Sequence, residues 1–562
     1  MSKKLLSMLL AACMLMGLLA GCGAKESTGS SSNNNATAAP VASTVPEAPA
    51  NAADATAGDK DLVFVISSDN GDLSPFGGDS GGRHHTYRMI YDCLCASYGL
   101  GNTVTELQGQ IAKSWDIVDG TTVDVEIYDY VKDSQGNPIT AEDVVYSYEQ
   151  AIASGTMEKL NGYLDKVTAT GDYTLRITLT SASKGAMEWT LTTVPIISKA
   201  WFSTASDADK TSNPAVTGAY VIKEFSSGSH TTLERNPDYW QTDASLRSYY
   251  DSQYYNTITI NVLKESSMRV IALENGEADV CQNVPAAEIS TFLNDDGTSA
   301  DGWSVYPDEN GRMNVLMFNN DNSVFADNKE LRQAVLYAID FNGVRLGYGN
   351  TPTNGQVCHD FSPDVSSDYL DEWNQEDYYD YNVDKAKELM AQAGYPDGGI
   401  TVSLMYQNST TATAGLTVLQ SYLAEIGITV ELNPVDQALF NSYKYDDTKW
   451  DMIVDSKSTT DFVTTVWQNV FDTNSFANGS ACFTHDDQLQ ALLEAAADAE
   501  HSTDDDLRAF HNYLRDQAYA IGMFWNYSYY VAREGLIMCQ DGFGNVTGST
   551  IIPSADFVSV GN

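Results

Sequence analysis

Apolar and polar residues alternate strictly in two short stretches of the chain. The apolar members are Val123, Val125 and Ile127 in the first stretch and Leu175, Ile177 and Leu179 in the second. Successive side chains of a β-strand point to opposite faces, so this alternation is typical of strands with one buried face. We therefore predict half-buried strands at both places.

Several other stretches carry apolar residues three or four positions apart, the spacing of one helix face. Residues that favour helix ends flank them: Thr140, Ser266 and Asn382 can cap N-termini, and Gly276 and Gly394 can end helices. Helices and strands that alternate along the chain predict an α/β or α+β architecture. The predicted faces are Val144, Tyr148 and Ile152; Met268, Ile271 and Ala272; Leu331, Val335 and Ala338; Ala386, Leu389 and Ala393; Leu416, Leu419, Leu423 and Ile426; Leu489, Leu492 and Leu493; and Leu507, Phe510 and Leu514.

The first residues have a different pattern. Lys3 and Lys4 precede the apolar run 5–19, which is too short to cross a bilayer comfortably. The run ends in Leu19-Ala20-Gly21-Cys22, which resembles the lipobox of bacterial lipoprotein signal peptides. The alternative is an ordinary signal peptide that happens to hold a cysteine. We expect residues 1–21 to be removed and Cys22 to carry a lipid that tethers the protein to the membrane.

Composition separates the next segment from the body. Residues 22–60 are rich in Ser, Asn, Ala, Thr, Pro and Gly and contain almost no large apolar side chain. Such a segment cannot bury enough surface to offset its ordering entropy, so it reads as a flexible spacer. About 500 residues follow, enough for two or three domains with their own cores.

The body is acidic. The chain holds 76 acidic and 31 basic side chains, and its net charge of −45 becomes −47 without Lys3 and Lys4. A body of this charge repels nucleic acid and anionic headgroups, so we expect no nucleic-acid partner.

Candidate catalytic and metal-binding motifs are weak. None of the seven histidines lies in a known catalytic or zinc motif, and His84-His85 reads either as an exposed loop pair or as a metal pair. Six cysteines follow residue 22 and read either as scattered buried thiols or as one or two disulfides. We predict no catalytic residue, cofactor or metal site. The cysteines are Cys93, Cys95, Cys281, Cys358, Cys482 and Cys539.

Nine short motifs occur in an order that resembles one protein family from about Leu62 to Leu536. The family is that of the extracytoplasmic solute-binding proteins of peptide-type ABC importers, the oligopeptide- and dipeptide-binding family (family 5). The motifs are Leu73-Ser74-Pro75; Tyr91-Asp92-Cys93-Leu94; Ile111-Ala112-Lys113-Ser114-Trp115; Pro138-Ile139-Thr140-Ala141-Glu142-Asp143-Val144-Val145-Tyr146-Ser147; Thr217-Gly218-Ala219-Tyr220; Leu233-Glu234-Arg235-Asn236-Pro237-Asp238-Tyr239-Trp240; Ala272-Leu273-Glu274-Asn275-Gly276-Glu277-Ala278-Asp279-Val280; Leu331-Arg332-Gln333-Ala334 with Ala338-Ile339-Asp340; and Lys385-Ala386-Lys387-Glu388-Leu389 with Ala393-Gly394-Tyr395.

This resemblance implies a two-lobed α/β fold that closes on a ligand around a hinge, with an extra subdomain inserted in the first lobe. By analogy the first lobe comprises 61–102, 213–312 and 531–562, the inserted subdomain 103–212 and the second lobe 313–530. The crossing strands are expected near 314–318 and 522–530.

The resemblance also implies where a ligand binds. An aspartate of the second lobe holds the α-amino group of the peptide in this family, and Asp461 with Phe462 stands at the matching position after the strand 450–454. Phe462 replaces the usual tyrosine, and Asp461 could instead cap a helix. Segments 91–94, with Asp92 and Leu94, and 406–408, with Tyr406 and Asn408, are candidate walls for main-chain pairing with a peptide. Trp467 reads either as part of an aromatic pocket or as core.

The resulting expectation is a lipid-anchored, monomeric binding subunit that captures a peptide or peptide-like solute. It would deliver that solute to the permease and ATPase subunits of an importer at the outer face of the membrane. The lipid tether and the spacer suit a Gram-positive cell. The same fold with a metal chelate, haem, sugar or opine as ligand is the nearest alternative, followed by a surface sensor and a surface enzyme.

Overall fold

The computed structural model describes residues 60–69, 71–77, 84–98, 106–285, 288–294, 297–307, 312–349, 356–358, 361, 366–375, 379–458, 462–473, 480–526, 528–539 and 546–561. The predicted signal peptide, Cys22, the spacer as far as residue 59 and Asp461 lie outside these residues. Within them, no helix is long and apolar enough to span a membrane.

The first lobe is built on a seven-stranded sheet. Strand β1 lies at its centre and runs parallel to both of its neighbours, whereas the outer strands pair antiparallel. Helix α7 (Ser266–Glu274) packs on one face through Ala272 and Leu273, and α1 (His84–Ile90) contributes to the main core. The strand order is β12 (Trp303–Pro307), β18 (Ser528–Arg533), β11 (Val280–Pro285), β1 (Lys60–Ile66), β10 (Tyr255–Val262), β9 (His230–Arg235) and β8 (Tyr220–Ser226).

A four-stranded antiparallel sheet forms the body of the inserted subdomain. Its two inner strands are the predicted ones, and the alternating apolar residues of both are buried, so these predictions are confirmed. The core of this subdomain is continuous with that of the first lobe. The elements are β4 (Ala112–Asp119), β5 (Thr122–Ile127), β7 (Thr174–Leu179) and β6 (Leu164–Ala169) in sheet order, with α2 (Ala141–Ser154), α3 (Glu158–Tyr163), α4 (Ala186–Thr193), α5 (Lys199–Phe202) and α6 (Asp207–Ser212).

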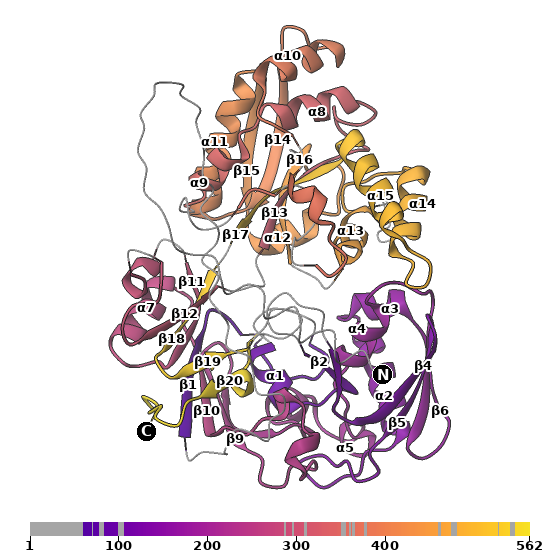
Figure 1. Cartoon of the computed structure of the whole chain (residues 1–562), viewed down its shortest axis with the longest axis vertical. Helices are drawn as coiled ribbons and strands as arrows, with labels where there is room; N and C mark the ends of the chain where they lie inside the picture. Colours follow the sequence, from indigo (N-terminus) through magenta and orange to yellow (C-terminus); the bar gives the residue numbers. More distant parts are fainter. Residues whose placement is uncertain are drawn as a thin grey trace, which may run out of the picture. The chain divides into compact units, whose positions relative to one another are not determined.

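The second lobe has a five-stranded sheet with a hydrophobic core on each face. Helices α8 to α11 cover one face and α12 to α15 the other, as Figure 1 shows around the strands. The order is β15 (Ile428–Val435), β14 (Ile400–Gln407), β16 (Met452–Ser458), β13 (Arg312–Phe318) and β17 (Ala520–Asn526). The helices are α8 (Lys329–Tyr337), α9 (Phe341–Gly347), α10 (Val383–Gln392), α11 (Thr410–Ala424), α12 (Gln437–Tyr443), α13 (Val463–Phe471), α14 (Asp487–Ala497) and α15 (Asp504–Gln517).

Smaller elements complete the chain. Two short ribbons pair β2 (Cys95–Tyr98) with β3 (Glu106–Gly109) and β19 (Leu536–Met538) with β20 (Ile551–Pro553). Short 3-10 helices are η3 (Ala244–Leu246), η4 (Tyr249–Asp251), η5 (Ile289–Phe292), η6 (Asp371–Gln375) and η7 (Gly548–Thr550).

Two consecutive strand pairs change sheet along the chain. The chain leaves the seven-stranded sheet after β12 and enters the five-stranded sheet at β13, and it returns between β17 and β18. These strands lie where crossing strands are expected. Strand β18 pairs with the first-lobe sheet from Ser528 onward, which favours a lobe boundary slightly before residue 530.

Local details of some predicted helices are wrong. Ile152 of α2 and both Met268 and Ile271 of α7 are exposed, because their helices bury neighbouring positions instead, such as Ala151 and Leu273. Ser266 does not cap α7 but is its first residue. The predicted caps Thr140 and Asn382 are confirmed, and Thr140 forms a capping box with Asp143.

The histidine pair and the cysteines are interior residues. His84 and His85 begin α1 and are both buried, so their interpretation as an exposed loop pair is wrong. Burial lowers the pKa of His85 to about 4. No group of three or more metal-ligating side chains occurs among the described residues. All six cysteines after residue 22 are buried free thiols, which confirms the first of the two interpretations.

Candidate functional site

Three adjacent strands of the second lobe run parallel, so their carboxyl ends lie at one edge of the sheet. Strand β14 pairs in parallel with both β15 and β16. In open α/β sheets, ligands bind outside the carboxyl ends of such strands. Tyr406 lies near the end of β14, Asn408 follows that strand, and Phe462 follows β16. The fold thus brings three of the predicted site residues to the same edge, although Phe462 is distant in sequence from the other two.

Tyr406 and Asn408 differ in what they offer to a ligand. The ring of Tyr406 is buried in the core, and its hydroxyl shares a 3.0 Å hydrogen bond with Thr413 Oγ1. Asn408 is exposed, and its main-chain N–H donates to Val435 O at 2.8 Å. The side chain of Asn408 is therefore the more accessible of the two.

Helix α13 begins directly after the predicted anchor segment. The carboxylate that caps the helix belongs to Asp368, which is distant in sequence. Phe462 is the N-cap residue of α13 but makes no side-chain capping bond. Instead the main-chain N–H of Val463 donates to Asp368 Oδ1 at 2.7 Å. The other oxygen, Oδ2, lies 3.2 Å from Lys184 Nζ, and both side chains are largely buried. Burial raises the pKa of Asp368, opposed by the Val463 N–H and by Lys184.

Lys184 belongs to a segment of the inserted subdomain, 182–185, that touches the second lobe. Its main-chain N–H donates to Ala497 O at 2.9 Å, and Ala182 O accepts from the N–H of Ala499 at 2.9 Å. Gln468 Nε2 of α13 donates to Ser183 Oγ at 3.0 Å. The segment 182–185 thus joins the subdomain to the helix that starts at the candidate site.

Phe462 packs against the same segment. A Cβ atom built on Gly185 would lie 3.1 Å from Cδ2 of the Phe462 ring. Gly185 also has a φ of +73°, a backbone conformation that residues with a side chain rarely adopt. A glycine here lets the aromatic ring approach the backbone.

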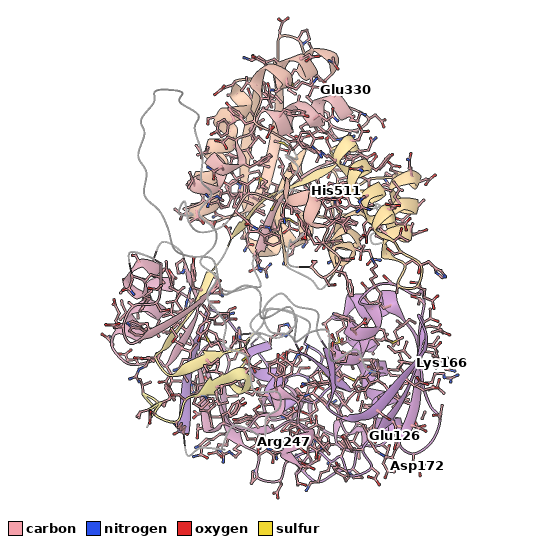
Figure 2. All side chains as sticks on the ribbon, viewed as in Figure 1. Glu126, Lys166, Asp172, Arg247, Glu330 and His511 are labelled. Atoms are coloured by element: carbon pink, nitrogen blue, oxygen red, sulfur yellow. The ribbon has the colours of Figure 1, made fainter. Side chains whose placement is uncertain are left out.

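Trp467 is placed as a core side chain. It is fully buried, stacks on Phe510 at 4.4 Å between ring centroids and lies 6.0 Å from the ring of Trp373. His511, labelled in Figure 2, stacks on the same Trp373 at 4.6 Å. Direct contact of Trp467 with a ligand would require these aromatic side chains to move.

Asp92 and Leu94 lie in the first lobe, where most of their polar groups already have partners. Asp92 Oδ2 accepts from Trp240 Nε1 at 2.7 Å and from the Tyr239 hydroxyl at 3.1 Å. Burial, followed by the nearby Asp251, raises the pKa of Asp92 well above its ordinary range. The Leu94 carbonyl accepts two main-chain N–H groups. A role of Asp92 and Leu94 in ligand binding stays a prediction. Few main-chain groups of this segment are left to pair with a peptide.

Sequence reasoning missed Asp368 and Lys184. Neither lies in a recognisable motif, and 184 positions separate them. The local pattern instead drew attention to Asp461, which lies outside the described residues. Only the tertiary fold places the Asp368 carboxylate at the start of α13.

The architecture of the two lobes indicates a class of protein. The chain has two α/β lobes, each with its own sheet, and it passes between them from β12 to β13 and from β17 to β18. This arrangement is typical of periplasmic-type binding proteins. Residues 106–477 match the family described as bacterial extracellular solute-binding proteins, family 5. The chain belongs to this family, so the predicted membership and fold class are confirmed.

Individual relatives are distant. The chain is 24% identical to the nickel-binding protein NikA of Staphylococcus aureus over 359 residues, covering 62% of this chain and 66% of NikA. It is also 24% identical to the glutathione-binding protein GsiB of Pectobacterium atrosepticum, covering 67% and 70%. The matches span between about half and seven-tenths of the length of such curated relatives.

The solved structures agree in fold. The periplasmic binding protein DppA of Helicobacter pylori, in complex with the peptide STSA, superposes with a TM-score of 0.71 at 20% identity. The superposition covers 88% of this chain and 98% of DppA.

Proposed function

We propose that this protein is the solute-binding component of an ABC importer and that it captures a peptide or peptide-like solute. The observation that carries the proposal is the carboxyl edge of β14 and β16, where Tyr406, Asn408 and the start of α13 come together in a chain of family 5. The protein would bind and release its solute without chemical change, and separate permease and ATPase subunits would move it across the membrane.

Peptide is the solute class that the fold supports best. The structurally similar DppA of Helicobacter pylori is seen with the peptide STSA. Main-chain hydrogen bonds to an extended peptide would supply affinity without regard to side-chain sequence. The nickel-binding relative keeps metal chelates as the main alternative.

The lobe assignment is part of the same proposal. Segments 61–102, 213–312 and 531–562 form the first lobe, 103–212 the inserted subdomain and 313–530 the second lobe. Sheet membership supports this division, with the last boundary moved to just before Ser528. The contacts of segment 182–185 with α13 and the turn after α14 then connect the subdomain to the opposite lobe.

Asp461 provides the first test of peptide binding. Removing one partner of a buried charge pair costs about 2 kcal/mol or more, which corresponds to about 30-fold in affinity. We expect Asp461→Ala to weaken binding of tetra-alanine at least about 30-fold in isothermal titration calorimetry, and N-acetylated tetra-alanine to bind the unaltered protein poorly. The exposed Asp397→Asn in the same lobe serves as the control and should bind normally.

Two outcomes would contradict this model in different ways. If free and acetylated peptides bind equally and Asp461→Ala has no effect, the amine anchor is wrong although the solute is a peptide. If no peptide binds but nickel chelates, haem or oligosaccharides do, the solute class itself is wrong. Turnover of any such compound by the pure protein would indicate a surface enzyme.

We also propose that Cys22 carries the lipid that holds the protein at the outer face of the membrane. The basis is the sequence Leu19-Ala20-Gly21-Cys22 after an apolar run, together with the composition of 22–60. Cells expressing the full chain should incorporate labelled palmitate into the protein, and Cys22→Ala should abolish the label and release the protein from the membrane fraction. Cys93→Ala is the matched control, because its thiol is buried. Unchanged labelling of Cys22→Ala would refute the tether.

A further inference from the structure

A side chain with an unused hydrogen-bond donor lies at the same edge of the second-lobe sheet. Asn314 is on β13, and residues two and four positions on, Leu316 and Phe318, pack into the core beneath α8 to α11. Strand alternation therefore directs Asn314 to this face. It is only 7% exposed, and among the described residues its Nδ2 has no hydrogen-bond partner. Buried polar groups in folded proteins are nearly always paired, so this amide asks for an explanation.

A second unused polar group belongs to a residue that packs against the register partner of Asn314. Phe524 of β17 is the register partner of Asn314, and the ring of Tyr348 packs edge-on against Phe524 with 5.0 Å between centroids. The hydroxyl of Tyr348 is buried, and no described residue is its hydrogen-bond partner. Burial, followed by the proximity of Tyr406, raises the pKa of Tyr348, so its hydroxyl remains protonated and can donate.

The backbone is shaped to admit the Tyr348 ring. Gly415 of α11 lies against it, and a Cβ atom at this position would collide with the ring carbons. Gly415 and Phe524 thus fix the position of the ring, and the position of the ring in turn fixes that of its hydroxyl.

A positive charge lies on the same strand as Asn314. Arg312 precedes Asn314 by two residues on β13, so both start from the same face of the strand, roughly 7 Å apart. Arg312 is exposed, and its Nη1 donates to Ser456 Oγ at 3.3 Å. Among the described residues no carboxylate pairs with Arg312, although the chain contains 76 acidic side chains. Four of the five guanidinium N–H groups are left for other partners.

We propose that Asn314, Tyr348 and Arg312 form a subsite that binds a carboxylate of the captured solute. An amide N–H, a phenolic O–H and a guanidinium are all donors, and together they match the acceptor oxygens and the charge of a carboxylate. A site whose buried donors need an acceptor discriminates strongly against an analogue that lacks one. The subsite would therefore select solutes with a carboxylate, complementing the expected amine anchor at Asp461. The inference rests on the proposed solute-binding function.

The test compares an acid with its amide in three variants. We expect tetra-alanine to bind the unaltered protein at least about tenfold more tightly than tetra-alanine amide, as measured by isothermal titration calorimetry. Tyr348→Phe should weaken binding of the acid at least about threefold and Arg312→Gln at least about tenfold, with little change for the amide. Asn314→Leu should behave like Tyr348→Phe. The exposed Tyr381→Phe, on the same lobe, should bind like the unaltered protein.

Each failure has its own signature. Tyr348→Phe removes only an unpaired hydroxyl, so its thermal midpoint should not fall, and folding will not obscure the result. If acid and amide bind alike and all three variants leave the affinity unchanged, the carboxylate subsite is overturned while peptide binding stands. If the unaltered protein binds no peptide in either form, both the subsite and the proposed function are overturned.

Discussion

Trp467→Ala should lower the free energy of unfolding of the second lobe by about 3–5 kcal/mol, the usual cost of truncating a buried large aromatic side chain. Trp467 is fully buried, stacks on Phe510 and lies beside Trp373 in the core that α13, α14 and α15 form on one face of the sheet. Removal of the indole leaves a cavity that this rigid aromatic cluster fills only in part. Urea denaturation followed by circular dichroism measures the loss.

A conservative variant separates a core role from a ligand-binding role for Trp467. Trp467→Phe keeps an aromatic ring next to Phe510, so most of the stability should remain. Among the described residues the indole Nε1 has no partner, so its loss removes no hydrogen bond to any of them. We expect Trp467→Phe to bind tetra-alanine within about twofold of the unaltered protein. The half-buried Trp201→Ala, in the inserted subdomain, should cost clearly less stability than Trp467→Ala. A stable Trp467→Phe that has lost its affinity would instead indicate a ligand wall.

Local patterns predict the elements of this fold well where one face of a helix or strand is buried. The spacing of Leu416, Leu419 and Leu423 correctly predicts α11, and the alternation in 123–127 correctly predicts β5. Periodicity fails at Ile152, Met268 and Ile271, because it does not say how wide the buried face is. Capping is ambiguous for similar reasons: Glu265, not Ser266, occupies the N-cap of α7.

The site is harder to predict, because its members meet only through long-range register. The pairing of Asn314 with Phe524 depends on an irregularity between β13 and β17, and Tyr348 reaches Phe524 from the end of α9. The Lys184–Asp368 pair joins the inserted subdomain to the start of α13. Spacing within one segment contains no information on either arrangement. Family motifs point to the edge of the sheet that carries Tyr406 and Phe462 but not to the polar groups beside it.

One motif residue that looked like a mere family signature has a clear structural task. Asp279 is fully buried at the start of β11, and its carboxylate accepts hydrogen bonds from Val63 N at 2.9 Å, Ser559 Oγ at 2.5 Å and Val560 N at 2.9 Å. Arg533 Nη1 lies 3.6 Å from it. One side chain therefore ties the central strand β1 to the C-terminal residues of the chain.

Asp279→Ala should consequently cost the first lobe about 3–5 kcal/mol of unfolding free energy. Breaking a buried charged network leaves its other members unpaired in the interior, and here two main-chain N–H groups and a hydroxyl lose their acceptor. Differential scanning calorimetry should show the first-lobe transition at a markedly lower temperature, with the second-lobe transition unchanged. Glu277 is exposed and lies two residues earlier, so Glu277→Ala is the matched control. It should change the unfolding free energy of either lobe by no more than about 0.5 kcal/mol. A loss below about 1 kcal/mol for Asp279→Ala would mean that water replaces the carboxylate, and that β1 is held to the C-terminal residues by packing alone.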